Sequence, residues 1–215
     1  MIDSNTIIES SGLYGKSFIQ KYNFPKTGEM KSKKVKLDDA LFGEGLCILN
    51  NHVYVLTWKS KQGFKYQLSN LKKIDTFNYD FEGWGITTDG THLIISDGTY
   101  TIRYLDPKTY KMVRKINVKF NGTPVHYLNE LEYVNGYILA NIWLSHTIAI
   151  IDPKSGHVIR ALNLSDLAGF ITKTNDNQVL NGIAYHPQTG HLLVTGKEWP
   201  IMFEIDVPFI RTPNQ

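Results

Sequence analysis

One cysteine, four methionines and the absence of long apolar runs set the first limits on this 215-residue chain. Cys47 has no second cysteine to pair with, which excludes an internal disulfide, and its place in an apolar strand predicts a buried, inert thiol. No run reaches the roughly 18 apolar residues of a membrane-spanning helix. The opening MIDSNTIIES lacks the charged and apolar regions of a signal peptide. We therefore expect the chain as given to be cytoplasmic, without a membrane partner.

Sequence patterns of several catalytic sites are also missing. The seven histidines form neither H-x-H nor H-E-x-x-H, so nothing predicts zinc chemistry. The segment GLYGKS (12–17) lacks the spacing of a phosphate-binding loop, and no G-x-S-x-G nucleophile turn occurs. The net charge is only +3, and the basic run KSKKVK (31–36) fits an exposed edge strand better than a nucleic-acid surface. We expect no metal-ligand cluster and no nucleic-acid partner.

Short β-rich runs, separated by turns such as DGT, NG and DPK, fill most of the chain. Four units repeat one order of parts, in which an opening cluster and an apolar run are followed by a turn and further strands. The openings of these units are GEGLCIL (43–49), EGWGIT (82–87), NELEYV (129–134) and NGIAYH (181–186). A four-stranded unit that repeats at roughly 40–50 residues is the pattern of a β-propeller blade.

The N-terminal part of the chain holds part of a fifth unit, with strands expected at 5–15, 17–24 and 31–37. We therefore predict an all-β fold, a five-bladed β-propeller in one domain over 1–215, whose first blade lacks its innermost strand. Helical periodicity is confined to 162–170. The blades are expected at about 1–40, 41–80, 81–122, 123–170 and 176–215.

The innermost strand of each propeller blade lines the central channel, so the residues that open these strands should meet at one channel mouth. These opening residues are Glu44, Glu82, Asn129 and Asn181. The residues expected beside them, at the ends of the following strands, are Trp58, Asp97, Trp143 and Lys197. Together these positions predict a concave small-ligand site.

All four tryptophans lie next to these positions, and Trp58, Trp84 and Trp143 predict an aromatic wall around the site. A carboxylate in such surroundings has a raised pKa, which suits Glu44 to carry a proton near neutral pH. Lys197 has two interpretations. It either holds the Glu44 charge or polarises a carbonyl group, or it is a surface lysine at a strand end.

The remaining polar candidates also have structural interpretations. Asn129 is either a site residue or a turn residue. For Glu82 and Asn181, closure of the turns between blades is the favoured interpretation.

A series of short strings occurs in order along nearly the whole chain, from about residue 5 to about residue 206. The strings are LYGKS, FGEGL, LTWK, EGWGIT, SDGT, LDPKT, LNELEYV, ANIW, IDPKSG, LNGIAY and VTGKEWP. The set resembles the plant and bacterial glutaminyl cyclases, also called glutaminyl-peptide cyclotransferases. The resemblance implies a five-bladed β-propeller that converts N-terminal glutaminyl residues to pyroglutamate with release of ammonia.

The same resemblance implies roles for individual residues. Glu44 is the expected catalytic carboxylate, and Asn129 and Lys197 are expected to contact the substrate or its developing charge. The residues expected to wall the substrate pocket are Phe42, Trp58, Trp84 and Trp143. No zinc and no cofactor is implied; some members hold a structural calcium ion in the channel, for which this sequence assigns no ligands. The expected partners are peptides or proteins with an N-terminal Gln, and we expect a monomer.

The first blade departs from the family pattern. Members usually open it with a strand containing an FTQGL-like segment after an export signal, and the Phe and Gln of that segment have no counterpart here. The alternatives are a start placed too far downstream, a trimmed chain, closure of the ring by another segment such as 207–215, or a decayed enzyme. Because members are often exported, a missing export signal would also change the predicted location.

Two other functions stay open. A propeller without turnover would act as a binding scaffold, for example for Gln-initiated peptides. A metal-dependent hydrolase of lactonase type would use a ring of oxygen and amide ligands, and the aromatic residues and Lys197 argue against it. The four residues that would form this ring are Glu44, Glu82, Asn129 and Asn181.

Overall fold

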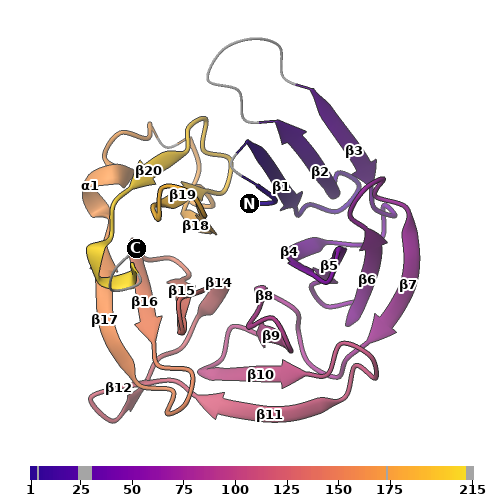
Figure 1. Ribbon diagram of the computed structural model, residues 1–215. Helices are drawn as coiled ribbons and strands as arrows, with labels where there is room; N and C mark the ends of the chain where they lie inside the picture. The colour runs from indigo at the N-terminus through magenta and orange to yellow at the C-terminus, as the bar shows by residue number, and fades with distance from the viewer. Residues whose placement is uncertain (4, 24–30, 173, 212–215) are drawn as a thin grey trace.

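The computed structural model describes residues 1–3, 5–23, 31–172 and 174–211. Five β-sheets follow one another around a central channel, and each is an antiparallel meander in chain order (Figure 1). The predicted all-β, five-bladed propeller is confirmed. Residue 24 of the strand expected at 17–24, and residues 212–215 of the segment 207–215, lie outside the described residues.

The five sheets are named blades 1 to 5 in chain order. Blade 1 contains β1 (Thr6–Ser11), β2 (Phe18–Asn23) and β3 (Ser32–Lys36). Blade 2 contains β4 (Gly43–Leu49), β5 (His52–Thr57), β6 (Gln62–Gln67) and β7 (Lys73–Asn78). Blade 3 contains β8 (Ile86–Thr88), β9 (Leu93–Ser96), β10 (Thr101–Leu105) and β11 (Met112–Asn117). Blade 4 contains β14 (Leu128–Val134), β15 (Tyr137–Ile142), β16 (Thr147–Ile151) and β17 (Val158–Asn163). Blade 5 contains β18 (Leu180–Tyr185), β19 (Leu192–Gly196) and β20 (Phe203–Ile205).

Short elements complete the chain between and after the blades. The ribbon of β12 (Lys119–Phe120) and β13 (Thr123–Pro124) connects blade 3 to blade 4. The helix α1 (Ser165–Ala168) lies within the segment 162–170, where the helical pattern was found, and connects blade 4 to blade 5. A 3₁₀ helix, Pro208–Ile210, follows β20, so the part of 207–215 that is described does not add a strand to the ring.

The apolar core lies between neighbouring blades. Leu93 of β9 packs in one cluster with Leu56 and Ile86, whereas the next residue, Ile94, packs in another cluster with Ala140 of blade 4. Successive residues of a strand point to opposite faces, so one strand serves two interfaces. As a result β9 is buried along its whole length, and the outer strands β7 and β11 are mostly exposed.

Two predictions about single segments are confirmed. Cys47 is a buried free thiol, and burial raises its pKa, so its reactive thiolate form is disfavoured. The basic run 31–36 contributes the exposed outer strand β3 of blade 1.

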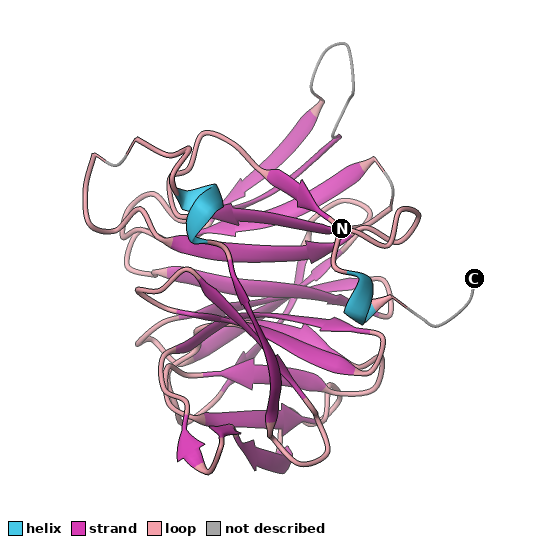
Figure 2. Ribbon diagram, turned by 90° about the vertical axis from the view of Figure 1, so that its left-hand side faces the viewer, coloured by secondary structure: helices cyan, strands magenta, loops and turns pink. Residues whose placement is uncertain are grey.

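The two ends of the strands form the two faces of the ring. The inner strands β4, β14 and β18 begin at the face that also carries the hairpins after β5, β15 and β19, and we call this face the channel mouth. Figure 2 shows the two short helices toward opposite ends of the strands; α1 is the one at the channel mouth. Among the described residues, no helix is long and apolar enough to cross a bilayer.

Candidate active site

A β-bulge at the start of three inner strands positions the polar candidates. In blade 2, Gly43 pairs with Thr57 and Leu46 pairs with Val55, so two residues, Glu44 and Gly45, lie opposite one. A bulge re-aims a side chain that a regular strand would direct elsewhere, and bulges are common beside active sites. The equivalent bulge residues of the other two blades are Asn129 with Glu130 in blade 4, and Asn181 with Gly182 in blade 5.

The glycine after Glu44 serves packing between blades. A Cβ on Gly45 would lie 2.8 Å from the Ile86 nitrogen and 2.9 Å from the Trp84 oxygen. The Gly45 N–H donates to that same Trp84 carbonyl at 2.8 Å. In blade 3, a Cβ on Gly85 would collide with the Asn129 carbonyl oxygen. The glycines let one inner strand touch the next, so the space at Gly45 is filled by the backbone of blade 3.

Blade 3 corrects the equivalence that the sequence analysis assumed. Trp84, between Gly83 and Gly85, occupies the place that Glu44 has between its own glycines, and Glu82 lies two residues earlier. Glu82 is therefore not the channel-lining partner of Glu44 in blade 3. Asp97 directly follows β9, at the strand end where it was expected, and its carboxylate pairs with Arg103.

The Glu82 carboxylate holds two tryptophans of the site. Its Oε2 accepts a hydrogen bond from the Trp58 indole N–H at 2.6 Å and from the Trp84 indole N–H at 3.0 Å. Glu82 lies in the connection between blades 2 and 3, as the favoured interpretation expected. The sequence analysis did not foresee that one of its carboxylate oxygens also fixes two indoles.

The predicted wall residues form an aromatic arc at the mouth, in two groups of rings that Glu82 links between Trp58 and Trp84. The rings of Phe42 and Trp58 lie 5.6 Å apart, and those of Trp84 and Trp143 lie 5.5 Å apart, both edge to face. Exposed tyrosines extend both ends, Tyr14 against Phe42 and Tyr127 against Trp143. The aromatic arc consists of Tyr14, Phe42, Trp58, Trp84, Trp143 and Tyr127.

The fourth tryptophan has a different role. Trp199 is buried in the apolar cluster of blades 4 and 5 and packs against Phe203. It supports the turn that carries Lys197, because its backbone N–H donates to the Gly196 carbonyl at 3.1 Å.

Glu44 is the site carboxylate with a strongly shifted pKa. Burial raises its pKa to about 8, the Lys197 ammonium opposes the rise, and the Glu82 charge adds to it. No hydrogen bond or ion pair joins the Glu44 carboxyl to the rest of the described chain. The carboxyl group therefore has no protein partner to displace, and its pKa lies near neutral pH, where proton transfer is most effective.

Backbone hydrogen bonds hold Asn129 and Lys197 in place, whereas their side chains make no hydrogen bond or ion pair within the described residues. The Asn129 carbonyl accepts from the Ser96 hydroxyl at 2.6 Å, and the Lys197 N–H donates to the Val179 carbonyl at 2.9 Å. Within the described residues, neither side chain has a hydrogen-bond or ion-pair partner, although the Lys197 charge lowers the pKa of Glu44 from across the mouth. Asn129 is buried, whereas Lys197 and Glu44 are half-buried.

Comparison with known proteins agrees with this arrangement. The family model described as glutamine cyclotransferase matches residues 1–207. The chain belongs to the glutamine cyclotransferase family. A glutaminyl-peptide cyclotransferase of Arabidopsis thaliana is 42% identical over 205 residues, which are 94% of this chain and 63% of that protein. The chain thus spans less than two thirds of the length of this relative.

Solved structures also resemble the chain. The crystal structure of Myxococcus xanthus glutaminyl cyclase has a TM-score of 0.77 and 31% identity, covering 94% of this chain and 90% of that one. The family resemblance found in the sequence is thereby confirmed. The crystal structure of a protein of unknown function from Bacteroides caccae has a TM-score of 0.58 and 12% identity, covering 96% and 70% of the two chains, and shows likeness of fold alone.

Two polar residues that the sequence analysis missed join the blades of this family member. Ser96 accepts from the Gly85 N–H at 2.8 Å while it donates to Asn129, and Asn141 Oδ1 accepts from the Gly182 N–H at 3.0 Å. Both residues are fully buried in apolar middle strands. A polar side chain within such a strand was the signal that could have identified them, because it needs a partner inside the fold.

Some family members hold a calcium ion in the channel, and Glu130 and Glu132 are the acidic residues to consider as its ligands here. Glu130 and Glu132 lie on the inner strand of blade 4, burial raises the pKa of both, and Glu130 Oε2 is buried without a hydrogen-bond partner in the described chain. Calcium takes roughly six to eight oxygen ligands. The described residues contain no group of three or more acidic, His or Cys side chains that could hold a metal. The described side chains therefore assign no ligand set for calcium, and we derive no role for a metal.

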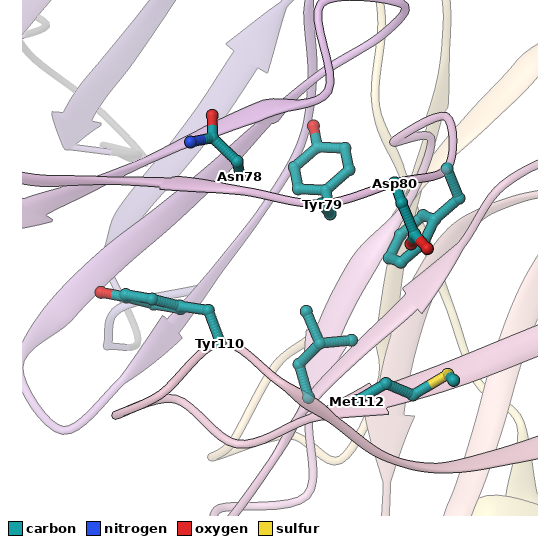
Figure 3. A pocket seen from close by; sticks show the side chains of 7 residues that line it. Asn78, Tyr79, Asp80, Tyr110 and Met112 are labelled. Carbon is teal, nitrogen blue, oxygen red and sulfur yellow. The ribbon is translucent and has the colours of Figure 1, made fainter.

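A separate hollow of about 400 Å³ lies between blades 2 and 3, and no residue of the aromatic arc lines it (Figure 3). Among its lining residues, Tyr79 supports the site, because its hydroxyl accepts from the Thr57 backbone N–H at 3.0 Å and donates to the Thr57 carbonyl at 2.6 Å. This contact fixes the end of β5, just before Trp58. The lining residues are Asn78, Tyr79, Asp80, Phe81, Leu105, Tyr110 and Met112.

Proposed function

We propose that the chain is a glutaminyl-peptide cyclotransferase, which converts an N-terminal glutaminyl residue of a peptide or protein to pyroglutamate and releases ammonia. One observation carries the proposal. The Glu44 carboxyl, whose pKa is raised to about 8, lies at the channel mouth with Lys197, the buried amide of Asn129 and the aromatic arc, and none of these three polar side chains has a hydrogen-bond or ion-pair partner in the described chain. Family membership and the relatives' names support the same reaction.

Glu44 moves the proton that the reaction requires. The substrate's α-amine attacks the carbon of its own γ-carboxamide, and the new C–N bond closes a five-membered ring. The Glu44 carboxylate accepts a proton from the attacking amine and then gives it to the departing –NH₂, which leaves as ammonia. One carboxyl group near pKa 8 serves both steps, because it ionises and reprotonates readily at the working pH.

Asn129 and Lys197 stabilise the charge that develops on the carboxamide oxygen. Attack on the carbonyl carbon produces a tetrahedral intermediate with an oxyanion, and an amide N–H and an ammonium are suitable donors for it. Both side chains start unengaged, so they need not break another contact first. Loss of one such donor typically lowers the rate about 100-fold or more.

The aromatic arc folds the substrate for ring closure. Since the attack is intramolecular, much of the rate enhancement comes from holding the amine against the carboxamide. Glu82 fixes Trp58 and Trp84 through its shared carboxylate oxygen, so the substrate meets rings that are already oriented. These chain residues account for every step, and the proposal is a metal-independent cyclisation.

The lactonase-type alternative conflicts with the observed contacts. Of its four hypothetical ligands, Glu82 uses its carboxylate for the indoles of Trp58 and Trp84. Trp84 stands in blade 3 where the ligand ring would need a polar group.

The test is ammonia release from a Gln-initiated dipeptide amide in the presence of a chelator. We expect release by the wild-type chain and loss of about 100-fold or more in Glu44→Gln and Lys197→Met. Glu204→Gln is the matched control, because Glu204 is a glutamate on the outer strand of blade 5 that pairs with His191. An active Glu44→Gln variant would contradict the role of Glu44, and binding of the peptide without turnover by the folded wild-type chain would favour the scaffold.

A further inference from the structure

Two large apolar residues stand exposed on either side of Trp143, at one end of the aromatic arc. Tyr127 is 53% exposed and Leu144 is 62% exposed. Tyr127 precedes β14 and Leu144 follows β15, so both lie at the channel mouth of blade 4. We call these two residues the outer pair.

The backbone of the outer pair is unusual for such side chains. Both residues have φ of +63°, in the left-handed region that favours glycine and asparagine. Bulky side chains there cost free energy, and such strain concentrates at functional sites. At an exposed turn position with this conformation, Asn or Gly gives the least backbone strain. The combination of exposure and strain therefore indicates that the apolar side chains themselves have a binding role.

The outer pair continues the arc that holds the substrate. The Trp143 N–H donates to the Tyr127 carbonyl at 2.8 Å, and the two rings lie 6.2 Å apart. Leu144 follows Trp143 directly in a turn closed by the Ser145 N–H, which donates to the Ile142 carbonyl at 3.1 Å. A group that leaves the site over Trp143 therefore meets Tyr127 and Leu144 next.

The equivalent turns of blades 2 and 3 are polar. Blade 2 presents Lys59, Ser60 and Lys61, and blade 3 presents Thr99 in an Asx-type turn with Asp97. The apolar character of this turn thus distinguishes blade 4 from blades 2 and 3, whereas the neighbouring blade 5 also exposes Ile201 in its turn between β19 and β20. The hairpin of blade 1 also exposes Tyr14, but there the left-handed residue is Gly15, so Tyr14 carries no comparable strain.

On the basis of the proposed cyclotransferase activity, we infer that the outer pair binds the side chain of the substrate's second residue and gives the enzyme a preference for large apolar residues there. The first residue reacts inside the arc, so the second is the one whose side chain reaches its rim. Its apolar surface would be covered by Tyr127 and Leu144, which are otherwise exposed to water.

The test compares kcat/KM for two peptides, Gln-Phe-amide and Gln-Gly-amide, in wild type and in two variants. We expect wild type to favour Gln-Phe-amide by about tenfold, the scale of discrimination by an apolar subsite. Leu144→Asn and Tyr127→Asn should each lower this ratio to about threefold or less. Asparagine suits the left-handed backbone, so both variants should keep their melting temperature.

The matched control is Lys61→Asn, at another exposed turn residue with positive φ, +52°, on the same face. It should leave the ratio of the two peptides unchanged. Equal turnover of both peptides by wild type, or an unchanged ratio in both outer-pair variants, would overturn the inference while leaving the cyclotransferase activity intact. Absence of turnover with either peptide in the folded chain would instead overturn the proposed function.

Discussion

The raised pKa of Glu44 makes the protein less stable as pH rises, and Glu44→Gln should remove this dependence. In the unfolded chain the carboxyl ionises near its ordinary pKa of 4.5, whereas in the folded chain it keeps its proton up to about 8. Between these values the folded state binds more protons than the unfolded state. The free energy of unfolding therefore decreases with pH across this window.

The size of the effect follows from the shift. Each pKa unit corresponds to about 1.36 kcal/mol, so the shift from 4.5 to about 8 would cost the folded state at most roughly 4 kcal/mol by pH 8. Water reaches part of the half-buried side chain, and we expect roughly 1–3 kcal/mol in practice. Glutamine resembles the protonated carboxyl, so Glu44→Gln should match wild type at about pH 5 and exceed it near pH 8.

Urea denaturation of both chains at the two pH values measures this difference. Glu204→Gln provides a control of opposite sign, because hydrogen bonding to His191 holds the pKa of Glu204 below its usual value. Its loss should lower stability slightly above that pKa and should never raise it. If Glu44→Gln is no more stable than wild type at pH 8, the carboxyl is not a desolvated group, and the basis for its proton-transfer role is wrong.

Three further predictions concern the same site and its support. Glu82→Gln removes a charge that raises the pKa of Glu44, so the pH at which kcat/KM rises should move below about 8, which a pH–rate profile measures. Lys197→Met removes a charge that lowers that pKa, so the same profile should move the other way while kcat falls about 100-fold or more. Movement of both profiles in one direction would contradict the electrostatic account. Gly45→Ala places a Cβ against neighbouring backbone and should lower the free energy of unfolding, measured by urea denaturation, by about 2–3 kcal/mol. In Gly182→Ala the new Cβ would be close to the Thr195 side chain alone, and the loss should be about 1 kcal/mol. Equal losses in the two variants would refute the packing explanation.

Much of the fold was predictable because turns and apolar runs recur along the sequence in the same order. Hairpin turns such as DPKT and DPKS recur at corresponding places, and period-two apolar runs between them indicate strands. The number of blades and the place of the short helix at 162–170 followed from these patterns. Local turn chemistry is enough here because each blade is built from short-range antiparallel pairs.

The candidate site was predicted less completely, since bulges and contacts between blades leave weak local signals. The glycines around Glu44 and Trp84 make these two residues equivalent in the repeat. The acidic side chain of Glu82, two positions before Trp84, instead indicated Glu82 as the equivalent of Glu44. Glu82 accepts hydrogen bonds from both Trp58 and Trp84, and Trp58 comes from a different turn, so the sequence gives no local sign of this contact. Nothing in the order of residues shows that Gly45 makes room for backbone and not for a ligand.

The most direct measurement of the central claim follows the fate of one peptide. A Gln-initiated peptide is incubated with the folded chain and a chelator, and mass spectrometry and an ammonia assay record both products together. The account predicts pyroglutamyl peptide and ammonia in equal amounts, at a rate that Glu44→Gln abolishes and Glu204→Gln leaves unchanged. Unaltered peptide after incubation with folded wild-type chain, or equal product from Glu44→Gln, would contradict it.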